Sequence, residues 1–222
     1  MIIQKGLIVT VTRIAAAIVA TVVWAMAAQA QAVTHRSDAP STASLIAEVH
    51  RAFTIEGKPI PPEIFRDFGD GDLADSGSIW VTVDIKAATG SNLYFDEIKQ
   101  NGRWVSQKKK STKGDIEEAT GYSYYGTTEN GLLVVLASYS GGGSGDFAML
   151  HILDIAAGRA LDLEGKTYER INLTNVRSIA LGDRWDGEVR IAKSAVRIIT
   201  TRKGPADDSG KRETLTIDAR RP

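Results

Sequence analysis

The sequence predicts a mainly β fold: an antiparallel sandwich, an open barrel or a curled sheet of about nine or ten short strands, with one short helix near the N-terminus. Two observations carry this prediction. Apolar or alternating runs recur along the chain and are separated by turn signals such as Asn101-Gly102 and Asn130-Gly131. Residues 132–136 and 147–155 are almost continuously apolar, which is typical of short strands buried on both faces of a sheet.

Residues 1–30 have the composition of an export signal. Lys5 supplies the positive charge, residues 14–28 form the apolar stretch, and Ala28-Gln29-Ala30 is a small-x-small cleavage site. We therefore expect a signal peptide cleaved near Ala30, a periplasmic or secreted mature chain, and no stable membrane span after cleavage. An uncleaved membrane anchor is the alternative, although it would place Arg13 inside the bilayer.

Residues 31–62 are predicted to hold a lead-in, one short helix and a Pro-rich connector, ahead of a single β domain at residues 63–222. Apolar side chains would share one face of a helix over residues 41–53. These side chains are Leu45, Ile46, Val49 and Phe53. Glycine and prolines in residues 57–62 would end the helix and stiffen the connection.

The β domain begins with a strand at residues 79–85, where apolar and polar side chains alternate. Residues 93–100 and 103–108 flank the Asn101-Gly102 turn. A loop is expected at residues 156–167. Further strands are expected at residues 122–128, 168–181, 188–201 (two strands around Lys193-Ser194) and 215–217.

A glycine-rich loop at residues 140–146 joins the two apolar runs. It lacks the lysine of a phosphate-binding loop, and it leads into a strand instead of a helix. We therefore interpret it as a hairpin connection that uses glycine for its backbone freedom.

Composition excludes several classes of function. The net charge is zero, with 27 basic and 27 acidic residues, so the chain has no basic footprint for nucleic acid. Cysteine is absent, which excludes a thiolate metal site and a cysteine nucleophile. The 3 histidines, His35, His50 and His151, are too few to favour a transition-metal site, and His151 lies among apolar residues that predict its burial. No cofactor is predicted.

Two groups of side chains are candidate binding sites. Aromatic rings could form a platform for sugar rings or peptide, although such rings are more often packing residues. These are Trp80, Trp104, Tyr124 and Trp185. Carboxylates crowded between glycines could hold calcium, or could be solvated side chains of a turn-rich loop. These are Asp70, Asp72 and Asp75.

Three segments resemble those of exported bacterial β-rich domains of unknown function. Residues 140–155 (SGGGSGDFAMLHILDI) resemble a GGSGxF strand, and residues 180–184 (ALGDR) resemble an LGDR segment that precedes a hairpin. Residues 68–73 (FGDGDL) resemble an FGDLNGDG opening, from which this chain departs at residues 74–76. The resemblance implies a secreted β-rich domain and assigns no catalytic residue.

These observations favour an exported bacterial protein with a non-catalytic binding or envelope-associated role. Its partner would be a protein or polysaccharide of the cell envelope. The alternative is a carboxylate-dependent hydrolase such as a glycosidase, which needs two carboxyl groups roughly 5–9.5 Å apart in a cleft. The candidates for that pair are Asp70, Asp72, Asp75 and Asp84.

Overall fold

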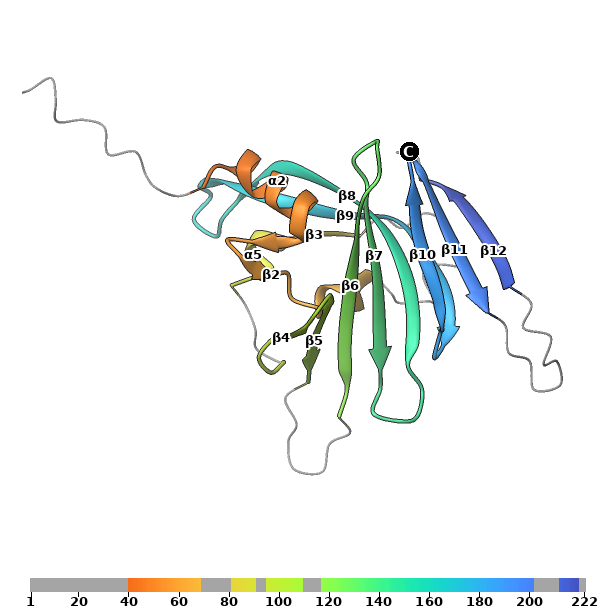
Figure 1. The fold of residues 1–222 in the computed structure, drawn as a ribbon. Helices are drawn as coiled ribbons and strands as arrows, with labels where there is room; N and C mark the ends of the chain where they lie inside the picture. The colour runs from red at the N-terminus through yellow and green to blue at the C-terminus, as the bar shows by residue number, and fades with distance from the viewer. Residues whose placement is uncertain (1–39, 69–80, 91–94, 110–116, 202–211, 220–222) are drawn as a thin grey trace, which may run out of the picture. The chain divides into compact units, whose positions relative to one another are not determined.

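A seven-stranded antiparallel sheet, in the order β3-β9-β8-β7-β6-β5-β4, organises the fold (Figure 1). The computed structural model describes residues 40–68, 81–90, 95–109, 117–201 and 212–219. The six strands from β4 to β9 form a meander, because each pairs with the next along the chain, and β3 pairs with β9. The strands are β3 (Thr82–Asp84), β4 (Lys99–Asn101), β5 (Trp104–Lys108), β6 (Ala119–Thr127), β7 (Leu133–Ser140), β8 (Phe147–Leu161) and β9 (Thr167–Asp183). The mainly β class is confirmed, as an open arrangement.

A smaller three-stranded sheet follows the large one. It consists of β10 (Gly187–Ala192), β11 (Ala195–Thr201) and β12 (Arg212–Asp218). All pairings in it are antiparallel, and β10 and β11 meet at the turn predicted at Lys193-Ser194. The left-handed backbone of Lys193, with φ 55°, closes this turn.

The segment ahead of the large sheet forms α2 (Thr42–Ala52), the two-residue strands β1 (Thr54–Ile55) and β2 (Lys58–Pro59), and α3 (Ile64–Phe68). The Ser41 side chain accepts a hydrogen bond from Ser44 N and caps α2, as the predicted helix over residues 41–53 requires. The segment packs into one core with the large sheet, so residues 40–62 belong to the same folded unit as the strands.

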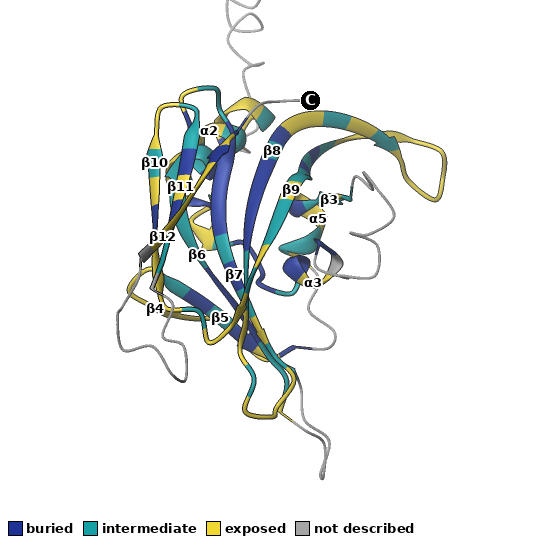
Figure 2. Cartoon of the chain, turned by 90° about the vertical axis from the view of Figure 1, so that its right-hand side faces the viewer, coloured by how far each residue is buried: buried dark blue, intermediate teal, exposed yellow. Residues whose placement is uncertain are grey.

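The structure corrects several strand boundaries, and within the strand predicted at residues 93–100 β4 begins only at Lys99. The strand predicted at residues 79–85 ends at Asp84, whose carboxylate accepts hydrogen bonds from the next backbone N–H groups and caps the helix α5 (Ile85–Ala88). The loop predicted at residues 156–167 is too long, because β8 and β9 continue pairing out to Leu161 and Thr167. Their backbone ladder extends beyond the sheet core, where exposed side chains leave no hydrophobic pattern to reveal it (Figure 2).

Strand β7 is buried on both faces, as the apolar run predicts (Figure 2). Leu133 and Val135 belong to a cluster with α2, α3 and α5, which we call the helix-side core. Leu132 and Val134 belong to a cluster with β10, β11 and β12, which we call the small-sheet core. The large sheet is therefore the middle of three layers.

Two leucines of the β8–β9 hairpin allow the contribution of burial to stability to be measured with the same substitution. Leu153 is buried in the helix-side core, whereas Leu163 is fully exposed at the hairpin turn. We expect Leu153→Ala to lower the free energy of unfolding by about 3 kcal/mol, because it removes packed methyl groups and leaves a cavity. Leu163→Ala should change it by less than about 0.5 kcal/mol. If urea unfolding gave the same loss of free energy of unfolding for both variants, the assignment of Leu153 to the helix-side core would be contradicted.

Candidate functional site

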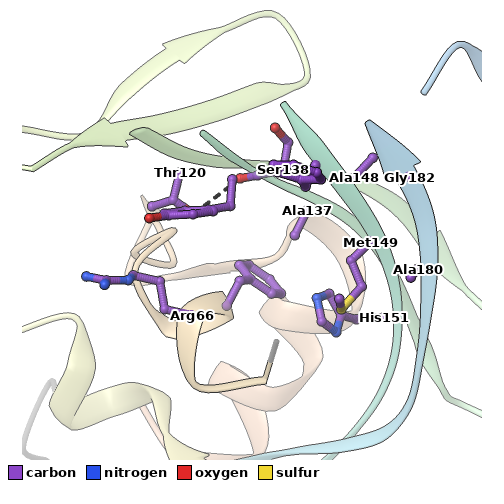
Figure 3. A pocket seen from close by; sticks show the side chains of 12 residues that line it. Arg66, Thr120, Ala137, Ser138, Ala148, Met149, His151, Ala180 and Gly182 are labelled. Carbon is purple, nitrogen blue, oxygen red and sulfur yellow. Dashed lines mark hydrogen bonds between the residues drawn. The ribbon is translucent and has the colours of Figure 1, made fainter. Parts of the chain in front are cut away.

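A cavity of about 400 Å³ opens on the helix side of the large sheet, between α3 and strands β6 to β9 (Figure 3). We call it the α3 pocket. Its lining consists of Phe65, Arg66, Thr120, Ala137, Ser138, Tyr139, Phe147, Ala148, Met149, His151, Ala180 and Gly182.

The α3 pocket forms because α3 covers only part of the helix-side face of the large sheet. Backbone bonds from Ile64 N to Pro61 O and from Phe65 N to Pro62 O start α3 directly after the prolines. Phe65 then packs over the sheet, 5.3 Å from His151 between ring centroids. Beyond this short helix the lining includes three alanines and a glycine, Ala137, Ala148, Ala180 and Gly182. Small side chains without cover leave space that a close-packed interior would fill.

His151 forms the buried polar part of the pocket wall. Its Nδ1 lies 2.9 Å from Ser178 Oγ, which also accepts a hydrogen bond from Asn175 Nδ2 at 2.8 Å. Burial under Phe65 and Phe68 lowers the pKa of His151 to about 4, so the imidazole is neutral at pH 7. The predicted burial of His151 is confirmed, and a neutral imidazole forms part of the pocket wall.

Among the lining residues that the structure describes, Arg66 is the cation. Its guanidinium lies 5.6 Å from the centre of the Phe95 ring and 3.6 Å from Glu118 Oε2. The other oxygen of Glu118 accepts a hydrogen bond from Lys109 Nζ at 2.7 Å. Lys109 is the main cause, with a smaller contribution from Arg66, of the lowered pKa of Glu118. These three described side chains, two cations and one carboxylate, carry one net positive charge.

Two of the three segments that carry the sequence resemblance meet beside the pocket. Asp146, at the end of the glycine-rich loop, donates its N–H to Asp183 Oδ1 at 2.8 Å and accepts from Arg184 N at 2.7 Å. Its carboxylate also accepts a hydrogen bond from the Ser138 hydroxyl. The hairpin connection predicted at residues 140–146 is confirmed, and its end is fixed to β9 beside the lining residues Phe147 and Gly182.

The predicted aromatic residues have separate packing roles. Tyr124 packs on the helix-side core, and its hydroxyl donates to His50 O at 2.6 Å. Trp185 packs on the small-sheet core and donates its indole N–H to Thr200 Oγ1 at 3.0 Å. The structure therefore does not bring Tyr124 and Trp185 together. Trp104 is half-buried, and Trp80 lies outside the described residues.

Each described tryptophan of this group lies over a glycine. A Cβ at Gly121 would overlap the ring of Trp104, and a Cβ at Gly187 would overlap the ring of Trp185. The ring can approach the backbone this closely only because glycine has no side chain. Part of each indole face is therefore already occupied by the chain itself.

The carboxylates of the predicted calcium site, Asp70, Asp72 and Asp75, lie outside the described residues. Asp84, the fourth carboxylate proposed for a hydrolase, caps α5 and also accepts a hydrogen bond from Ile171 N at 3.4 Å. Within the described ranges no group of three or more metal-ligating side chains lies close enough to hold an ion.

Comparison with known proteins found no match to a family model, to a curated protein or to a solved structure. In the part of the chain that the structure describes, no helix has the length and apolar character needed to cross a bilayer.

The buried imidazole predicts a specific pH dependence of stability. In the unfolded chain His151 titrates near its ordinary pKa of 6.5, whereas burial lowers the pKa to about 4 in the folded chain. Between these values the unfolded chain binds a proton that the folded chain does not, so stability decreases as the pH falls through this window. At pH 4.5 this contribution amounts to roughly 2–3 kcal/mol.

Urea unfolding of the wild type and of His151→Gln at pH 7.5 and pH 4.5 measures this contribution. Glutamine retains hydrogen-bonding capacity and does not titrate, so the variant should lose less stability on acidification than the wild type. An equal loss in both proteins would show that His151 is not buried in its neutral form.

Proposed function

We propose that this protein is an exported, non-catalytic binding domain and that the α3 pocket holds a small, mainly apolar ligand. The volume of about 400 Å³ carries the proposal, because small-molecule sites generally enclose roughly 300–1,000 Å³. Apolar walls with a few polar groups are also typical of such sites. Phe65, Phe147 and Met149 supply large apolar surfaces here, and His151 supplies a polar group.

The chemistry of the described lining supports binding over catalysis. No carboxylate lines the pocket among the described residues, and the hydroxyl of Ser138 is already bonded to Asp146. The lowered pKa of His151, about 4, makes it a weak base, since a general base works best with a pKa near the operating pH. The hydrolase alternative stays a prediction that has no support from this pocket.

Export is supported by the signal-like composition of residues 1–30 and by the resemblance to exported domains. A protein or polysaccharide partner in the cell envelope also stays a prediction. Affinity capture from an envelope extract tests it, with bound small molecules extracted and identified from the same sample.

Binding in the α3 pocket can be tested with N-phenyl-1-naphthylamine, an uncharged apolar probe whose fluorescence rises in apolar surroundings. Ala180→Trp would place a large ring in the pocket wall, and we expect it to weaken probe binding by at least about tenfold. Met149→Trp offers a second block from strand β8. Fluorescence titration of the full chain measures both effects.

Ala157→Trp is the matched control, because Ala157 is exposed on the outer part of β8 and does not line the pocket. All three variants keep the apolar residues 14–28, so any probe that binds to this segment contributes equally to the fluorescence of each protein. If all three variants bound the probe like the wild type, the pocket would not be its site and the proposal would fall.

A further inference from the structure

The charges around the α3 pocket are distributed unevenly. Arg66 lies at one side of the pocket and His151 at the other (Figure 3). At the Arg66 side, Lys109 forms the close contact with Glu118, at 2.7 Å, whereas Arg66 is 3.6 Å from the same carboxylate. A separation of 3.6 Å is too long for a hydrogen bond, so this contact leaves the guanidinium donors available to a ligand.

The guanidinium is also held in position. Arg66 follows Phe65 in α3, and Phe65 is buried in the helix-side core. Its guanidinium lies over the ring of Phe95, which restricts the long side chain at the edge of the cavity. The side chain is 43% exposed, so a charged group that binds it does not have to leave water completely.

The glycine-loop side of the pocket carries the opposite charge. Asp146 and Asp183 lie there with one cation, Arg184, whose guanidinium is 2.9 Å from the Asp183 carboxylate. The backbone N–H of Asp146 is the main cause of the lowered pKa of Asp183, which keeps this carboxyl group ionised at neutral pH. An anion would therefore be repelled from this side and attracted to Arg66.

We infer that the ligand of the α3 pocket is a small amphiphilic carboxylate, with its carboxylate at Arg66 and its apolar body against Phe65, Met149 and the alanines of the sheet. The inference rests on the proposed function and specifies the ligand class. Guanidinium and carboxylate groups match in geometry and form charge-assisted hydrogen bonds. One net positive charge suits one monoanionic head group. The neutral imidazole of His151 adds no charge in the deeper part of the pocket.

A pair of probes with the same chain length tests the head group directly. Decanoate and decan-1-ol compete with N-phenyl-1-naphthylamine for the full chain in parallel titrations. Decanoate should displace the probe at about one tenth of the concentration that decan-1-ol needs. Arg66→Gln should remove this advantage by raising the concentration of decanoate that displaces the probe, and Arg66→Lys should restore part of it. Added salt should weaken decanoate alone.

Arg103→Gln is the matched control, because Arg103 also lies over an aromatic ring, 5.4 Å from the centre of Tyr125, and does not line the pocket. It should preserve the advantage of decanoate. If decanoate kept its advantage in Arg66→Gln, or showed none in the wild type, the carboxylate assignment would be overturned while the apolar pocket stood. Failure of the pocket itself is detected separately, by unchanged probe binding in Ala180→Trp.

Discussion

The burial of β7 on both faces is the constraint on which the rest of the structure depends. Its side chains at residues 133–137 alternate between the helix-side core and the small-sheet core, so neither face of this part of the strand lies against water. Two separate layers are then required, and the chain supplies them from its two ends: α2 and α3 before the large sheet, and β10 to β12 after it. On the helix side the cover is shorter than the strands that it covers. The α3 pocket lies where this cover ends.

The parts of the fold that the sequence predicts are those decided by local chemistry. The hairpin signalled by Asn101-Gly102, the helix capped by Ser41 and the doubly buried run at residues 132–136 each have a signal within a few residues. The turn of this hairpin is Gly102-Arg103, one residue later than predicted, because Asn101 pairs with Trp104 at the end of β4. The outer hairpin of β8 and β9 has no such signal, because exposed strands are held by their backbone pairing. The end of β3 depends on whether Asp84 caps a helix or continues a strand, and tertiary contacts decide this.

The α3 pocket could not be predicted, because its lining is scattered over four strands and one short helix. An alanine such as Ala180 does not predict a pocket by itself, because a small side chain leaves a cavity only where no larger residue packs against it. The tryptophans show the converse problem. Trp104 and Trp185 look available in the sequence, but Gly121 and Gly187 bring the chain itself against their rings. Of the pocket lining, only the burial of His151 could be predicted, because the residues around it in the sequence are apolar.

The neutral polar group of the pocket, His151, is buried and the charged one, Arg66, is partly exposed, as the cost of burying charge requires. His151 is fully enclosed, and its lowered pKa leaves it neutral, since an unpaired buried cation would be strongly disfavoured. Arg66 stays partly in water, where its charge is retained at little cost. A ligand that places an anion beside Arg66 and apolar atoms beside His151 meets both conditions. A ligand bound in the reverse direction would bury its charge against a neutral ring and direct its apolar end into water. The cost of burying charge therefore also sets the direction in which an amphiphile would bind.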